Sequence, residues 1–143
     1  SSFNQDIGVW AVDNVISMAS MFLVARAFNQ DIGGWAVHSV MTMQGMFNGA
    51  SVFDQDIGGW AVGSVTNMKN MFHRAKAFDQ DISGWAVHGV TSMEKMFKEA
   101  SAFDQDLGWC VDDDVILTDA FLNAPCASTS CGVTQGSCTR RNF

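Results

Sequence analysis

Several kinds of residue are scarce in this chain of 143 residues. Charged residues make up only 16%, and 8 Lys plus Arg face 15 Asp plus Glu, so the chain lacks the basic face of a general nucleic-acid binder. It contains one Pro and no Tyr, and no apolar run approaches the roughly 20 residues of a membrane-spanning helix. Apolar residues nevertheless make up 48%, which argues against intrinsic disorder and predicts one domain or a short repeat array.

The sequence repeats with a period of 25 residues. The fifth row departs from it, because Trp109 comes one residue early and an extra Asp in 112–114 restores the register. A period of this length lies within the range of leucine-rich-type repeats, which stack to share one core. The clearest columns are Phe3, Phe28, Phe53, Phe78 and Phe103; Trp10, Trp35, Trp60 and Trp85; and Met18, Met43, Met68 and Met93.

Each row combines two local patterns. Residues 60–62 alternate as a short strand does, whereas the apolar residues of 65–75 recur at intervals of three and four, as in an amphipathic helix. The sequence therefore predicts an α/β fold: a right-handed, leucine-rich-repeat-like solenoid over residues 1–125. Each of its five coils is expected to contain one short parallel strand and one helix.

Four phrases of the third row carry a family resemblance: residues 53–57 (FDQDI), 59–62 (GWAV), 64–68 (SVTNM) and 71–72 (MF). They resemble the BspA-like leucine-rich-repeat surface proteins, and the resemblance extends from residue 3 to about residue 125. It implies a secreted or surface-exposed solenoid that serves adhesion or protein binding.

All four cysteines fall near the C-terminus, where the repeat stops: Cys110, Cys126, Cys131 and Cys138. An even number in an irregular segment predicts two disulfides that staple a C-terminal cap over residues 126–143, with three connectivities open. Their spacing does not match a zinc ribbon or finger, which is the alternative. Disulfides predict an extracellular, cell-surface or other oxidising lumenal location.

Two polar or aromatic columns admit a functional interpretation beside a structural one. Asp6, Asp31, Asp56, Asp81 and Asp106 could bind Ca²⁺, but Asx turns that accept turn amides are the more common arrangement. The Trp column could stack on sugars if it faced outward, but it shares a face with the Val column of the predicted strand. We therefore predict that it is buried.

Catalysis has no recognisable signature. No nucleophile elbow, phosphate loop or zinc pattern is present, and the three His lack a nucleophile and an orienting acid. We predict that the chain is not an enzyme and has no cofactor and no metal site.

The predicted function is a structural or protein-interaction scaffold, either a surface adhesin or an accessory subunit of a larger assembly. A carbohydrate-binding module is the alternative, with ice and calcium binding less favoured. The chain begins without a cap, so its N-terminal edge is a second predicted docking site for a protein partner. The candidate contact residues vary between rows while the core columns do not: Asp13, Asn14, His38, Ser39, Ser64 and His88.

Overall fold

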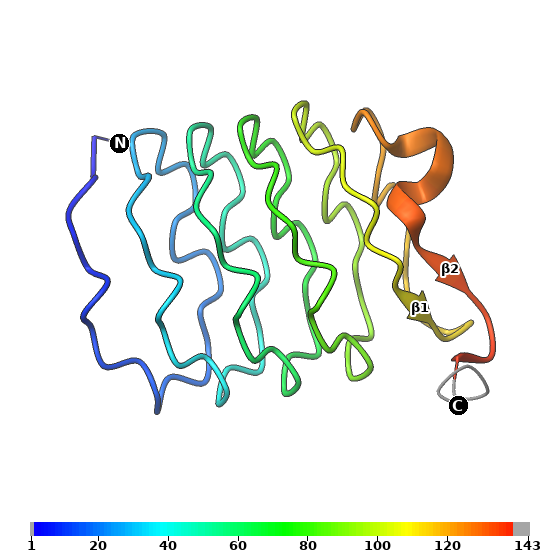
Figure 1. The fold of residues 1–143 in the computed structure, drawn as a ribbon, viewed down its shortest axis with the longest axis horizontal. Coiled ribbons are helices and arrows are strands. Elements are labelled where there is room, and N and C mark those ends of the chain that lie inside the picture. Colours follow the sequence, from blue (N-terminus) through cyan, green and yellow to red (C-terminus); the bar gives the residue numbers. More distant parts are fainter. Residues whose placement is uncertain (1, 139–143) are drawn as a thin grey trace.

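The computed structural model describes residues 2–138, so Ser1 of the predicted repeat region and residues 139–143 of the predicted tail lie outside the described residues. The chain winds in five stacked coils followed by a short tail (Figure 1). The coils are 3–27, 28–52, 53–77, 78–102 and 103–125. Within residues 2–138, regular elements occur only in the C-terminal part: strand β1 (Cys110–Val111), the 3₁₀ helix η1 (Ala127–Gly132) and strand β2 (Thr134–Gln135).

The predicted right-handed, leucine-rich-repeat-like α/β solenoid of five strand-plus-helix coils is wrong. Residues 2–138 contain no α-helix, and the one pair of named strands, β1 and β2, lies at the C-terminal end. The expected strand 60–62 is irregular, and the expected helix 65–75 is an extended segment followed by turns. Between the described coils, parallel strand pairing is limited to single-residue bridges, such as that of Thr42 with Asn67.

Consecutive β-turns explain why the helix prediction failed. The amide of Met71 donates to the carbonyl of Met68 at 3.2 Å, an interval of three, whereas an α-helix uses four. Asn70 and Arg74 have left-handed φ angles of 57° and 59°, which an α-helix does not accommodate. Turns of this kind place apolar residues on one side at intervals of three and four, so they reproduce the periodicity of a helix.

Backbone hydrogen bonds join each coil to the next through this turn-rich part. Each coil has a front segment, which runs from its first Phe to the Val two residues after its Trp and is 53–62 in coil 3. The chain then returns in a back segment, which is 65–75 in coil 3. Alternate amides of the back segment point along the stack, and that of Phe72 donates to the carbonyl of Met96 at 2.8 Å. These alternate amides thus hold the stack together rather than closing a helix.

The core lies between the front and back segments and consists of ladders of identical side chains. Phe72 stacks between Phe47 and Phe97, with ring centroids 5.5 and 5.4 Å away, and it also lies 4.2 Å from Phe78. Such offset aromatic contacts add to the gain from burial itself. The 25-residue period of the sequence is therefore a real stacking period, although its coils contain no helix.

The tail continues the stack over the front of coil 5 only. β2 pairs in parallel with β1, Cys110 opposite Thr134, and the amide of Leu107 donates to the carbonyl of Cys131 at 2.8 Å. Residues 131–136 therefore occupy the place that the front segment of a sixth coil would have.

Two disulfides fix this cap, as predicted: Cys110–Cys138 and Cys126–Cys131. No cysteine of the described residues is free. The sequence had left three connectivities open, and the structure selects this one.

Candidate contact surface on the first coil

The six predicted contact residues lie at the tips of equivalent turns, along one corner of the stack. Asp13 and Asn14 form the first tip, His38 and Ser39 the second, and Ser64 and His88 belong to the third and fourth. All are exposed except Ser39, which is half-buried. The corner is thus a continuous polar row, and its role as a contact region stays a prediction.

The Asp side chains of the acidic column accept hydrogen bonds from amides of their own turns. Oδ1 of Asp31 accepts the amide of Gly33 at 2.9 Å, and the same contact recurs between Asp56 and Gly58. At Asp81, the hydroxyl and amide of Ser83 lower the pKa of the carboxyl below its ordinary value. These are Asx turns, the arrangement that the sequence favoured over calcium binding.

A second polar column links neighbouring coils. Oδ1 of Asn29 accepts the amide of Asp54 at 2.9 Å and the side-chain amide of Gln55 at 3.1 Å. Asp54 repeats the pattern with the next coil, toward Asp79 and Gln80. This Asn/Asp–Gln ladder stabilises the exposed face of the front segments.

The Trp column is buried from coil 2 onward, as predicted, but the prediction is wrong for Trp10, which is 52% exposed. The indole of Trp60 lies between those of Trp35 and Trp85, with centroids 6.4 and 6.3 Å away. Its N–H donates to the carbonyl of Ile32 at 3.0 Å. The faces of these three rings are covered, so they offer no platform for sugar stacking.

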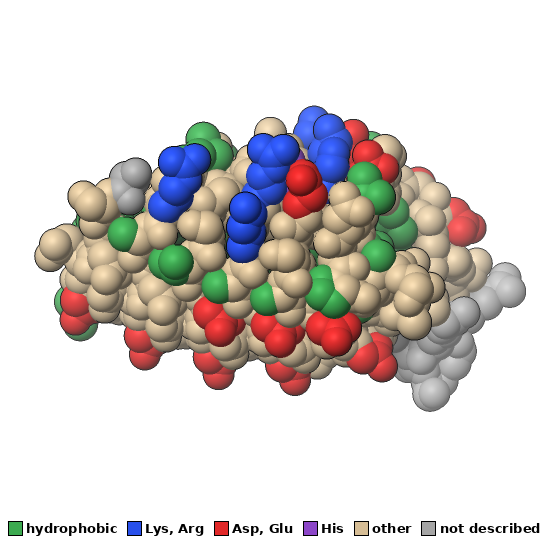
Figure 2. All heavy atoms as spheres, turned by 90° about the horizontal axis from the view of Figure 1, so that it is seen from above, with side chains coloured by type: hydrophobic (Ala, Val, Ile, Leu, Met, Phe, Trp, Pro, Cys, Tyr) green, Lys and Arg blue, Asp and Glu red, His purple; other side chains and the backbone are tan. Residues whose placement is uncertain are grey.

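Charge is divided between two sides of the molecule. The front segments contain eight Asp and no Lys or Arg, whereas the described basic residues lie in the back segments or in the turn that follows them. Figure 2 shows a row of acidic side chains along one long edge and basic side chains gathered on the opposite side. The basic residues of the described chain are Arg26, Lys69, Arg74, Lys76, Lys95 and Lys98.

Part of the basic side is neutralised by carboxylates from the next coil. Lys69 pairs with Glu94 at 3.0 Å, and Glu99 accepts from Arg74 at 3.2 Å and contacts Nε2 of His73 at 3.4 Å. Burial lowers the pKa of His73 below its ordinary value, against the opposing hydrogen bond to Glu99. This group is a structural tie between coils 3 and 4.

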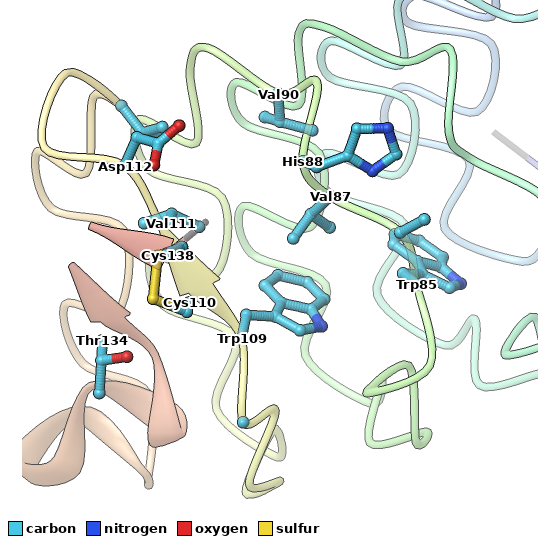
Figure 3. Close-up of a pocket in the computed structure, with 13 residues that line it drawn as sticks. Trp85, Val87, His88, Val90, Trp109, Cys110, Val111, Asp112, Thr134 and Cys138 are labelled. Atoms are coloured by element: carbon cyan, nitrogen blue, oxygen red, sulfur yellow. A yellow bond between two sulfur atoms is a disulfide. The ribbon is translucent and has the colours of Figure 1, made fainter. Parts of the chain in front are cut away.

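A cleft of about 690 Å³ opens where coils 4 and 5 meet the cap (Figure 3). Its lining includes Trp85 and Trp109, with His88 and Asp112, and the Cys110–Cys138 disulfide forms part of it. Among the described residues, His88 and Asp112 form no ion pair, and no group of three His, Cys, Asp or Glu side chains could hold a metal ion. His88 is the one predicted contact residue that lines this cleft.

Coil 1 exposes side chains whose column neighbours are buried. Trp10 is 52% exposed whereas Trp35 is 4% exposed, and Phe3 and Met21 are likewise exposed where Phe28 and Met46 are fully buried. These three side chains form the N-terminal edge, which in other coils is covered by the preceding coil.

Coil 1 also has apolar residues at positions that point away from the stack. Val9 is 92% exposed, and the three following residues of its column are Gly34, Gly59 and Gly84. A preceding coil would not cover Val9 or Ile16, because the equivalent residues of coils 2 to 4 are exposed despite having neighbours on both sides. We call the outward apolar residues of coil 1 the rim: Val9, Ile16, Leu23 and Val24, exposed by 38–92%.

The rest of the rim differs from its columns in the same way. Leu23 is followed by Asn48, His73 and Lys98 in the later coils. Val24 has a left-handed φ of 55°, which is strained for a β-branched residue, and its neighbour in the next coil is Gly49. The left-handed φ recurs at this turn position in the other coils, as at Arg74 and Glu99, so only the apolar side chain is special to coil 1. Exposed apolar groups are typical of interaction sites.

Sequence reasoning missed the rim because it took its contact candidates from polar variation. The signal was available in the columns, where Val9 replaces three glycines and Leu23 replaces polar residues. Neither apolar side chain contributes to stacking, so its presence at an outward position indicates another role.

These features define a protein of stacked 25-residue coils in which coil 1 carries exposed apolar side chains at outward positions. The chain belongs to the family described as Mycoplasma protein of unknown function, DUF285, whose model matches residues 1–72 and 34–130. A search of curated proteins and a search of solved structures each gave no match.

Two further observations concern the environment of the chain. The two disulfides indicate an oxidising environment outside the cytoplasm. Across residues 2–138, no helix has the length and apolar character needed to span a bilayer.

Proposed function

We propose that the chain is a non-enzymatic protein-interaction module of an extracellular or cell-surface setting, and that coil 1 is its principal contact surface. The observation that carries the proposal is the rim, because Val9, Ile16 and Leu23 place apolar groups in water where equivalent positions are mostly glycine or polar. Burying one such side chain contributes about 1.5–3 kcal/mol, so a partner that covers several of them gains substantial affinity.

The setting follows from the disulfides and from the resemblance to BspA-like surface proteins. Two bridges persist in an oxidising compartment. The resemblance favours adhesion or protein binding. Service as an accessory subunit of a larger assembly is the other form of the proposed role, and the origin of the bound partner distinguishes the two.

A quantitative binding assay tests the proposal. Immobilised chain is exposed to proteins of the native surface, and any bound protein is measured against two matched variants in the chain. Leu23→Asp places a charge on the rim and is expected to weaken binding at least about 10-fold. Thr66→Asp changes an exposed position of coil 3 and is expected to leave binding unchanged. Equal binding by the two variants would contradict the proposal.

Carbohydrate binding, the alternative, loses the support of the Trp column. Trp35, Trp60 and Trp85 are each no more than 4% exposed, so their faces cannot stack on sugar rings. A glycan array tests the alternative directly, and binding that persists in Leu23→Asp would place it elsewhere than on the rim.

A further inference from the structure

We propose that the cleft between coil 4, coil 5 and the cap is a second binding site, which takes a small organic cation with an apolar body. The site is separate from the rim of coil 1 and goes beyond the proposed function. Three observations carry the inference: a change of register between coils 4 and 5, a core side chain that reaches solvent there, and an unpaired carboxylate at one end of the cleft.

Coil 5 departs from the register of the other coils before its Trp. In coils 1 to 4 the Trp follows the Ile of the preceding turn by three residues, whereas Trp109 follows Leu107 by two. The indole N–H of Trp109 donates to the carbonyl of Ser83, 26 residues earlier, at 3.3 Å. The indoles of coils 2 to 4 each donate to a carbonyl 28 residues earlier, at 3.0 Å. Coil 5 therefore lacks one residue before its Trp.

After Trp109 the chain has one residue more than the other coils. In coil 4 the amide of Val90 closes the corner turn on the carbonyl of Val87, which ends the front segment. In coil 5 the amide of Val115 closes this turn on the carbonyl of Asp112, one residue beyond the front segment. Asp112 is thus an added residue at the corner, and the front segments of coils 4 and 5 do not align as those of earlier coils do.

A core side chain at this junction reaches solvent. Val87 is 7% exposed, although it has a coil on either side, whereas Val37 and Val62 of the same column are 1% and 0% exposed. Val87 lines the cleft together with Val111 of coil 5. The volume of about 690 Å³ is in the range of small-molecule sites, which combine apolar walls with a few polar groups. The misaligned junction therefore opens to a ligand an apolar surface that is buried in coils 2 and 3.

The polar groups of the cleft favour a positively charged ligand. In Figure 3, Asp112 and His88 lie toward one end of the cleft and the two Trp indoles toward the other. Neither the carboxylate of Asp112 nor the imidazole of His88 has a hydrogen-bond or ion-pair partner within residues 2–138. No Lys or Arg of this range lines the cleft, and Asp113 and Asp114 add negative charge beside it. An ammonium group therefore fits beside Asp112, and an aromatic body fits against the apolar wall.

Nuclear magnetic resonance of the isotope-labelled chain tests the proposal, with benzylamine as the probe and benzyl alcohol as its uncharged counterpart. The indole N–H resonances of Trp85 and Trp109, which line the cleft, are expected to shift saturably with the amine, while that of Trp60 hardly changes. Benzyl alcohol lacks the charge and is expected to bind about 5-fold more weakly, the upper range for an exposed ion pair. Absence of a saturable shift, or a shift of Trp60 as large as that of Trp109, would overturn the proposal.

Asp112→Asn tests the contribution of the charge. This variant is expected to bind benzylamine about 5-fold more weakly than the wild type does and to bind benzyl alcohol equally well. Its matched control is Asp13→Asn, which removes an exposed carboxylate that directly follows the core residue Val12 in coil 1. The control is expected to bind both probes as the wild type does. Benzylamine binding by Asp112→Asn that equals the wild type contradicts the assignment of the ligand as a cation.

Ala86→Leu tests the position of the site independently of charge. Ala86 is exposed and lines the cleft, so a larger side chain narrows it and is expected to weaken binding of both probes at least about 5-fold. Ala61→Leu changes the same column in coil 3 and is expected to leave binding unchanged, and thermal unfolding checks that both variants fold. Equal binding by the two Leu variants would place the site elsewhere and overturn the proposal.

Discussion

Coils 1 and 3 contain the same core residues in the same order, yet their surfaces differ. Coil 3 has coils on both sides, its Phe and Trp rings are covered, and its outward positions are glycine, threonine, histidine and arginine. Coil 1 exposes Phe3 and Trp10 and has Val9, Leu23 and Val24 at the outward positions. Stacking dictates the inward columns, and the apolar outward residues of coil 1 have no counterpart in coil 3.

The comparison also separates stability from interaction. In coil 3, the polar outward groups serve the stack, as when Lys69 pairs with Glu94 and His73 with Glu99 of the next coil. In coil 1, no ion pair is formed by the described residues. Substitutions in the interior coils are therefore expected to lower the free energy of unfolding. Substitutions at the outward positions of coil 1 are expected to weaken binding.

The largest expected contrast is between equivalent phenylalanines. Phe72→Ala leaves a cavity among Phe47, Phe78 and Phe97 and is expected to lower the free energy of unfolding by about 3–5 kcal/mol. Phe3→Ala, in the same period but 38% exposed, is expected to lower it much less. Urea unfolding of both variants measures the difference, and equal losses would show that coil 1 is as structurally important as coil 3.

A pair of adjacent glycines tests how tightly the interior coils approach. A Cβ on Gly58 would lie 2.5 Å from the backbone oxygen of Asp81, whereas a Cβ on Gly59 would meet nothing within 4 Å. Gly58→Ala is therefore expected to destabilise the chain by about 1–3 kcal/mol, as overpacking does. Gly59→Ala is expected to stay within about 0.5 kcal/mol of the wild type. Similar melting temperatures for the two would refute the close coil contact.

A substitution in coil 1 is expected to stabilise the chain. Val24→Gly removes a β-branched side chain from a left-handed φ of 55°, the conformation that Gly49 adopts one coil later. The strain relieved exceeds the added flexibility of the unfolded chain, for a net gain of about 1 kcal/mol. Thermal unfolding measures the gain, and binding by coil 1 should weaken in the same variant. A loss of stability would show that Val24 is a folding residue.

The smallest effect concerns pH. Because burial lowers the pKa of His73 in the folded state, the unfolded chain binds the proton more readily, so acidification destabilises the fold as pH falls below the ordinary value of 6.5. The pKa of Glu99 is lowered by its hydrogen bonds to Arg74 and His73, so its contribution is lost at lower pH still. His73→Gln is expected to flatten the stability curve between about pH 5 and 7. An unchanged slope would assign the pH dependence to other groups.

Much of the molecule could be predicted from the columns of the sequence. The even number of cysteines predicted two disulfides but left their connectivity open. Burial of Trp35 and Trp60 and the Asx turns of Asp31 and Asp56 followed from repetition and from elementary hydrogen-bond chemistry. These features depend on which residues recur, and recurrence is visible without coordinates.

Local conformation could not be predicted in the same way, because two structures share one periodicity. Met68 and Phe72 face the core from consecutive turns as well as they would from a helix. The distinguishing signal was that Gly45 and Gly49 occupy the columns of Asn70 and Arg74, where the backbone is left-handed. The rim was missed because Val, Ile and Leu are common residues. They are unusual here only because the equivalent positions of the other coils are mostly glycine or polar.

Amide hydrogen exchange at single-residue resolution tests most directly whether coil 1 is the contact surface. In the free chain, the amides of Phe47 and Phe72, which donate to the next coil, are expected to be protected. On binding of a protein partner, exchange in coil 1 is expected to slow while these interior amides hardly change. Unchanged exchange throughout coil 1 in the bound chain would contradict the account.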